Sequence, residues 1–169
     1  MRKFLDGTVV TGAIGFIAIL ALSAVFDHTI IALHAFQALM YLAVIALVSR
    51  RNRWGYFLAL AIAAFWNYTN LFVTNFFESG LATLRRLAAT GQLTHPDQLI
   101  AVAAVVFHLL MIASGLVRIV QTSRKAGADL ATFLVALVGQ TAYFAAIVAL
   151  FQPRYLQLFP RLFHPHGLG

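Results

Sequence analysis

Residues 99–121 read LIAVAAVVFHLLMIASGLVRIVQ, and only His108 and Arg118 in this stretch carry an ionisable side chain. A helix needs about 20 such residues to cross the hydrocarbon of a bilayer. Four more stretches of this kind, separated by short polar or basic connectors, lie at residues 8–26, 29–48, 54–77 and 130–151. The sequence therefore predicts an all-α integral membrane protein, a bundle of five transmembrane helices that forms one domain over residues 1–169.

The composition agrees with this prediction. Hydrophobic residues make up 62% of the chain, charged residues make up 10%, and the mean hydropathy is +0.87. A soluble domain of 169 residues has too little interior to hide so much apolar surface. Lipid also requires every backbone N–H and C=O to be paired within the protein, and segments without period-two alternation do not build a barrel. We therefore expect membrane lipids to surround a helical bundle.

The basic residues predict the orientation of the bundle. Eight of them fall on one side of the predicted spans, namely Arg2, Lys3, Arg50, Arg51, Arg53, Arg118, Arg124 and Lys125, and four fall on the other, namely Arg85, Arg86, Arg154 and Arg161. Cytoplasmic connectors carry the excess of Lys and Arg, so we expect the N-terminus inside and the C-terminus outside a prokaryotic cytoplasmic membrane. Anchoring to anionic lipid also explains the net charge of +7 without a nucleic-acid partner.

Two segments outside the spans have patterns of their own. In the connector at residues 78–98, Leu81, Leu84 and Leu87 recur at helical spacing, which predicts a short amphipathic helix in the outer interface. The alternative is an ordinary polar loop. The tail, residues 152–169, mixes prolines with aromatic residues, and we expect an irregular strap along the outer surface or against a partner.

Polar side chains inside the spans are the candidates for a ligand site, because such groups are costly at membrane depth. The six candidates are His34, Gln37, Asn67, Asn70, His108 and Gln140. A helical rise of about 1.5 Å per residue places them roughly 8–15 Å below the outer surface, so they share the outer half of the bilayer. We expect them to converge on one pocket. The alternative is that they only link helices by hydrogen bonds.

His34 and His108 lie on different spans, as the two axial ligands of a b-type haem would. Their estimated depths differ by about 7 Å, which counts against a shared iron. A single histidine holding a tetrapyrrole is another possibility, and the cofactor stays undetermined. The sequence predicts no metal site beyond these two readings.

The first span carries Gly7, Thr11 and Gly15 at every fourth position, which predicts a face for close association with another helix. Catalytic patterns are missing: the chain has neither a Gly-x-Ser-x-Gly run, nor an HExxH run, nor a phosphate-binding glycine loop. All five acidic residues fall at or beyond the ends of the spans.

These features favour a non-catalytic membrane subunit that packs against other subunits of a larger complex. The alternative is a membrane protein that binds a small molecule or cofactor, such as a quinone-type ligand, haem or pigment, in the outer-half pocket. A small transporter or channel is disfavoured, since membrane-embedded acids and an internal repeat are both missing.

Overall fold

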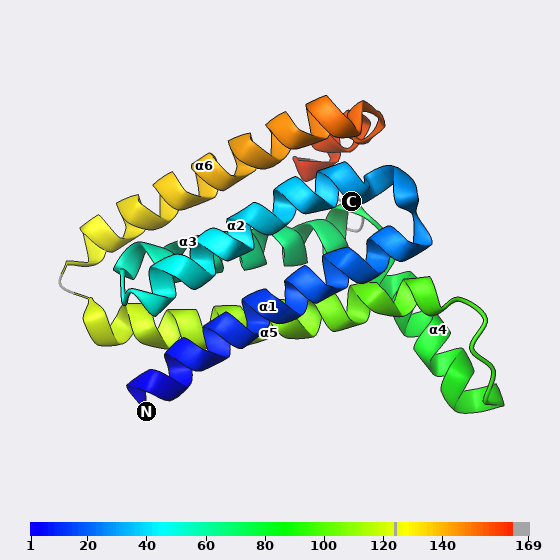
Figure 1. Cartoon of the computed structure of the whole chain (residues 1–169), viewed down its shortest axis with the longest axis horizontal. Helices are drawn as coiled ribbons and strands as arrows, with labels where there is room; N and C mark the ends of the chain where they lie inside the picture. The colour runs from blue at the N-terminus through cyan, green and yellow to red at the C-terminus, as the bar shows by residue number, and fades with distance from the viewer. Residues whose placement is uncertain (124, 164–169) are drawn as a thin grey trace.

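The computed structural model describes residues 1–123 and 125–163, and these residues form a bundle of helices (Figure 1). In chain order the elements are α1 (Arg2–Phe26), η1 (His28–Ile30), α2 (Ile31–Ser49), α3 (Arg53–Tyr68), η2 (Thr69–Val73), α4 (Phe76–Thr90), α5 (Pro96–Thr122), α6 (Ala126–Phe151) and η3 (Pro153–Leu162). Five helical stretches are long and apolar enough to cross a membrane: α1, η1 with α2, α3 with η2, α5, and α6. The predicted all-helical bundle of five apolar helices is therefore confirmed.

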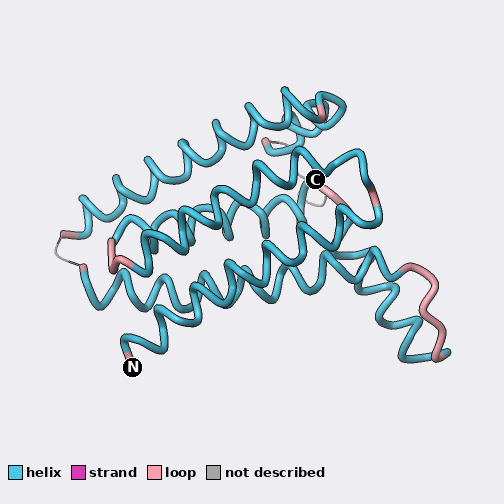
Figure 2. The backbone as a smooth tube through the Cα atoms, viewed as in Figure 1, coloured by secondary structure: helices cyan, strands magenta, loops and turns pink. Residues whose placement is uncertain are grey.

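Local sequence explains where several helices begin and end. Asn52 caps α3, because its side-chain oxygen accepts a hydrogen bond from the backbone N–H of Trp54 at 3.0 Å. Pro96 stands in the first turn of α5, where its missing N–H costs nothing. Gly91 ends α4 in a left-handed conformation with φ of 69°, which a residue without a Cβ adopts easily. The connections between these helices are short, as Figure 2 shows.

The centre of the bundle lies between α1, α2, α3 and α5. Its largest fully buried side chains include Tyr41, Tyr56, Ile62 and Met111. α1 and α5 approach each other closely, because a Cβ built on Gly12 would meet the Phe107 carbonyl oxygen at 2.8 Å. The last long helix, α6, packs against α3 and α2 and lies along the top of the bundle in Figure 1.

The third span differs from its prediction at one end. The predicted span continues to residue 77, whereas the apolar helix ends at Val73. Hydrogen bonds widen to π-helical spacing over Thr69–Val73, and Thr74 is extended, with φ of −118° and ψ of 164°. Because Thr74 breaks the helical path, α4 starts in a new direction and projects from the end of the bundle (Figure 1).

The two segments outside the spans are also helical. The amphipathic helix predicted around Leu81–Leu87 exists as the longer helix α4. The first part of the tail, expected to be irregular, forms the 3₁₀ helix η3, and residues 164–169 lie outside the described part of the chain. A 3₁₀ helix tolerates Pro153 at its first position, where no backbone donor is needed.

Candidate functional site

A cavity of about 610 Å³ lies at the end of the bundle where α1 turns into α2. Side chains from α1, η1, α2, α3, η2, α4, α5, α6 and η3 line it. The polar side chains among them are Ser23, Asp27, His34, Gln37, Thr69, Asn70, Thr74, Ser79, Asp97 and Gln98. Its volume is in the range of about 300–1,000 Å³ that small-molecule sites occupy.

Aromatic rings form much of the wall of this cavity. They are Phe16, Phe26, Phe65, Trp66, Phe76, Phe144, Tyr155 and Phe159. Phe144 packs edge-on against both Phe65 and Trp66, with ring centroids 5.5 Å and 5.6 Å apart. Such a wall offers flat apolar surface, and the few polar groups between the rings can orient a molecule lying on it.

The floor of the cavity is the ring of Phe16. This ring stacks on Tyr41, with 4.6 Å between centroids, and on His108, with 4.1 Å between centroids. Behind it, the Tyr41 hydroxyl lies 2.9 Å from Nε2 of His108, and both residues are fully buried. Phe16 thus separates the cavity from a hydrogen-bonded Tyr–His pair in the core of the bundle.

Gln37 is the unusual polar group of the wall. Its side chain is 1% exposed, yet neither Oε1 nor Nε2 has a hydrogen-bond partner among the described residues. Leaving a buried polar group unpaired costs about 1–3 kcal/mol, so such groups normally face a partner or an ordered water. The Gln37 carboxamide offers one acceptor and two donors to a molecule that enters the cavity.

His34 lies one turn before Gln37 on α2, and its ring is held in place. Nδ1 donates a hydrogen bond to the Leu20 carbonyl oxygen at 3.0 Å and lies 3.2 Å from the Ser23 hydroxyl. With the proton on Nδ1, Nε2 carries a lone pair and acts as an acceptor. The opposite wall contributes Asn70, which the π-helical turn η2 brings to the cavity lining.

The rim of the cavity is tied together by Thr29 and its neighbours. Asp27 accepts hydrogen bonds from the backbone N–H and the hydroxyl of Thr29, at 2.9 Å and 2.6 Å. These bonds, led by the one from the hydroxyl, hold the pKa of the Asp27 carboxyl below its ordinary value. Arg154 approaches Asp27 at 3.6 Å, and Gln152 donates a hydrogen bond to the Thr29 carbonyl.

The first residues of the tail close one side of the cavity. The Tyr68 hydroxyl donates a hydrogen bond to the Leu162 carbonyl at 2.7 Å, which fixes the far end of η3 to α3. Tyr155, Phe159 and Leu162 of η3 belong to the lining. The segment predicted as a strap therefore helps to form the wall of the cavity.

The six candidate residues do not all meet at this cavity. His34, Gln37 and Asn70 line it, whereas Asn67, His108 and Gln140 are buried but do not belong to its lining. His108 lies behind Phe16, and Gln140 donates a hydrogen bond to the Thr141 hydroxyl on its own helix at 3.0 Å. His34 and His108 thus occupy different environments, one on the cavity wall and one beneath the floor.

The three small residues of the first helix also divide into two groups. A Cβ on Gly15 would lie 2.3 Å from a ring carbon of Phe107, so Gly15 faces α5. Gly7 and Thr11 are exposed, and nothing lies within 4 Å of a Cβ on Gly7. Gly12, adjacent to the predicted set, provides the second close approach to α5.

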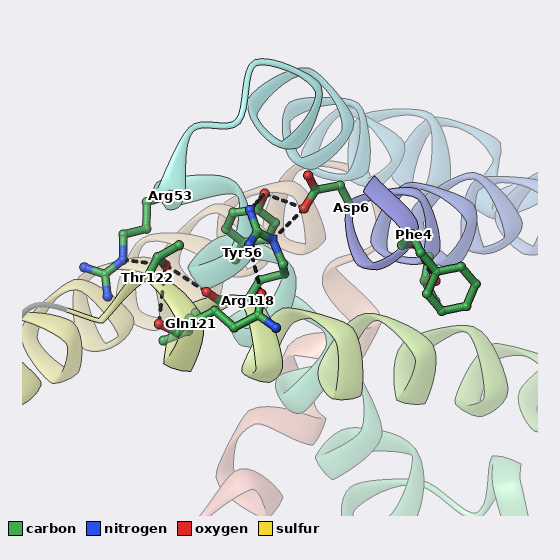
Figure 3. A network of polar contacts seen from close by, with 9 residues as sticks. Phe4, Asp6, Arg53, Tyr56, Arg118, Gln121 and Thr122 are labelled. Atoms are coloured by element: carbon green, nitrogen blue, oxygen red, sulfur yellow. Dashed lines mark hydrogen bonds and ion pairs between the residues drawn. The ribbon is translucent and has the colours of Figure 1, made fainter. Parts of the chain in front are cut away.

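The opposite end of the bundle holds an ion-pair network that the sequence did not reveal (Figure 3). Arg118 is 6% exposed and donates from Nε to Asp6 Oδ1 at 2.7 Å. The Tyr56 hydroxyl donates to the same oxygen at 2.7 Å, and the Arg118 guanidinium lies 5.2 Å from the centre of the Tyr56 ring. Arg118 therefore links α5 to α1 and α3 inside the bundle.

A second ion pair lies near the first. Arg53 Nη1 is 2.6 Å from Asp129 Oδ1, which connects α3 to α6, and the Ser123 hydroxyl donates to Asp129 Oδ2 at 2.6 Å. The sequence predicted both arginines to be anchors for anionic lipid. Asp6 and Asp129 are the sequence signal that could have indicated these ion pairs. Each lies within one or two helical turns of the end of the bundle where Arg118 and Arg53 lie.

Comparison of the chain with protein-family models, with curated proteins and with solved structures finds no match in any of the three. The function is therefore argued from the cavity and its surroundings.

Proposed function

We propose that this protein is an integral membrane protein that binds a small, largely apolar molecule in the cavity. The observation that carries the proposal is Gln37, a fully buried carboxamide with no partner among the described residues, on the wall of a cavity rich in aromatic rings. A bound molecule with a donor or an acceptor would satisfy this carboxamide and relieve its cost.

Insertion in a membrane is part of the proposal. Large aliphatic side chains point away from the bundle, among them Val120 and Leu150, which are 73% and 74% exposed. In lipid these side chains are solvated by acyl chains, whereas in water each would cost free energy in proportion to its apolar area. The basic-residue count favours an N-terminus in the cytoplasm, and in that orientation the cavity opens toward the outer side.

The lining suits binding better than catalysis. Ring faces, three amides and an imidazole can hold a molecule in a defined orientation. His34 donates its Nδ1 proton to a carbonyl of α1, a partner that orients the ring but does not activate it as a base. We therefore propose that the protein holds its ligand without transforming it.

The role of subunit in a larger complex remains a second candidate. It is favoured by the exposed side of α1 at Gly7 and Thr11, where another helix can approach closely. The two roles are compatible, because this side is distinct from the cavity.

Filling the cavity tests the binding function. Ala101 lines the cavity, and Ala113 lies further along α5 on the exposed surface. Protein purified from its own membranes in mild detergent is extracted with organic solvent, and the extract is analysed by mass spectrometry. We expect a molecule that is enriched stoichiometrically with the wild type and with Ala113→Trp and is lost from Ala101→Trp. Identical extracts from all three folded proteins would contradict the proposal.

A further inference from the structure

The charged side chains that line the cavity are acidic, although the chain as a whole is basic. The protein has 12 Lys and Arg and only five Asp and Glu, for a net charge of +7. Two of those five acids, Asp27 and Asp97, line the cavity, and no Lys or Arg among the described residues belongs to the lining. An anionic ligand would therefore lose its hydration shell without gaining a cationic partner in the lining.

The two acids differ in how far they are neutralised. Asp27 has Arg154 at 3.6 Å and two hydrogen bonds from Thr29. Asp97 is exposed in the first turn of α5 and forms no ion pair with any described residue. Its carboxylate also interacts with the helix terminus, which is worth about 0.3–1 kcal/mol, but this interaction leaves most of the negative charge available.

Deeper in the cavity, the hydrogen-bonding groups and the rings favour a positively charged donor. Gln37 Oε1 is buried and unpaired, and Nε2 of His34 carries a lone pair because Nδ1 donates to Leu20. The faces of aromatic rings attract cations, most strongly the face of tryptophan, and Trp66 belongs to the lining.

We propose that the cavity binds a hydrophobic organic cation, namely a protonated amine attached to an aromatic or other bulky apolar body. This inference rests on the proposed function and adds the chemical class of the ligand. The apolar body lies among the rings, and one ammonium N–H donates to Gln37 Oε1. The uncompensated charge of Asp97 at the rim raises the local concentration of cations.

Three probes with one apolar body and different head groups test the proposal: pyrenylmethylammonium, pyrenylmethanol and pyrenecarboxylate. Energy transfer from Trp66 to pyrene reports binding in the variant Trp54→Phe, because Trp54 is the only other tryptophan and lies at the opposite end of α3. The whole chain is used in nanodiscs of uncharged phosphatidylcholine. The signal of Ala101→Phe in the same background, which occupies the cavity without adding a second tryptophan donor, gives the partition into lipid, which is subtracted.

We expect the ammonium probe to bind most tightly, the alcohol less tightly and the carboxylate least tightly. Asp97→Asn keeps the size of the side chain but removes its charge. This substitution should weaken binding of the ammonium probe by about threefold to fivefold, which is the effect of a partly exposed ion pair. The affinity for the alcohol should stay the same. Glu78→Gln, an exposed acid of α4 outside the cavity, is the matched control and should change neither.

Gln37→Leu provides a second, independent arm of the test. It should weaken the ammonium probe and the alcohol alike, because both donate a hydrogen bond. Three results would overturn the cation proposal and leave the binding function intact. The first is equal affinity for the ammonium probe and the alcohol, and the second is tightest binding of the carboxylate. The third is an equal effect of Asp97→Asn and Glu78→Gln on binding of the ammonium probe. If no probe binds in a saturable way above the Ala101→Phe background, the binding function itself is wrong.

Discussion

Arg118 and Asp6 form an ion pair at 2.7 Å between the last turns of α5 and the first turns of α1. The Asp6 oxygen that receives the guanidinium also receives the Tyr56 hydroxyl, so one carboxylate joins three helices. The cavity lies at the other end of the bundle. We infer that this ion pair holds the helices together at one end while they stay apart at the other.

Removing the charge of Asp6 should therefore destabilise the bundle. Asp6→Asn leaves Arg118 buried without its anionic partner, and we expect a loss of about 1.5–3 kcal/mol in the free energy of unfolding. Tyr56→Phe combined with Asp6→Asn should lose less than the sum of the two single variants, because both share one oxygen. The measurement is unfolding in mixed micelles. A loss no larger than that of the exposed control Lys3→Gln would show that the pair adds no stability.

Gln37→Leu should make the unliganded protein more stable. The substitution removes a buried carboxamide that has no partner among the described residues, and we expect a gain of about 1 kcal/mol. Gln140→Leu is the matched control, since Gln140 is also buried but donates to Thr141; it should be neutral or destabilising. Thermal unfolding followed by circular dichroism compares the two. A loss of stability in Gln37→Leu would indicate that an ordered water already satisfies the carboxamide.

Gly15 and Gly7 should respond differently to the same substitution. Gly15→Leu forces a side chain into the ring of Phe107 and should lower the thermal midpoint by pushing α1 away from α5. Gly7→Leu meets no neighbour within the chain, so the midpoint should stay the same. If Gly7 and Thr11 form an association surface, Gly7→Leu reduces co-purification of the partner. Unchanged assembly on blue native gels would assign that surface to lipid.

Asp27 should make stability at the cavity rim depend on pH. Its pKa is lowered in the folded state, chiefly by the hydrogen bond from the Thr29 hydroxyl, so its stabilising effect is complete above the unfolded pKa and is lost as the pH falls through the lower folded pKa. The difference in thermal midpoint between the wild type and Asp27→Asn should thus be constant near neutral pH and shrink below about pH 4. Glu78→Gln serves as the control. If the difference in thermal midpoint between the wild type and Asp27→Asn grows as the pH falls, the pKa of Asp27 is not lowered in the folded state.

Orientation can be tested directly because the chain has no cysteine. Single cysteines at Arg50 and Gln92, two exposed positions at opposite ends of the bundle, are labelled in intact cells with a membrane-impermeant maleimide. We expect Gln92→Cys to react from outside and Arg50→Cys to react only after the cells are opened. The reverse pattern would invert the orientation, and labelling of both from outside would argue against a five-span chain.

The bundle was predictable because the length and apolarity of a segment are local properties. The end of the third span was not, because Phe76 and Phe77 continue the apolar pattern beyond Thr74 and Asn75. Hydropathy therefore gives no sign of the break at Thr74. The buried role of Arg118 was equally hidden, since its partner is 112 positions away and a basic residue near the end of a span resembles a lipid anchor.

For the candidate site, the sequence predicted the position of each polar group along the bundle axis. It did not predict which way each side chain faces. The helical rise placed His34, Gln37 and Asn70 at similar heights, and these residues do line one cavity. The same reasoning placed His108 near them, yet its ring lies behind Phe16. Which way a side chain faces depends on how each helix is rotated about its axis, and packing against other helices sets that rotation.

The π-helical turn at Thr69–Val73 adds one residue to what would otherwise be a regular helix. Deleting one residue there would restore regular spacing and rotate everything that follows by about 100° around the helix axis. Asn70 would then leave the cavity wall, and α4 would emerge on another side of the bundle. The shape of this end of the bundle thus depends on the length of the chain at this turn as well as on its side chains. Insertions and deletions in this short stretch are therefore expected to alter the molecule more than most substitutions do.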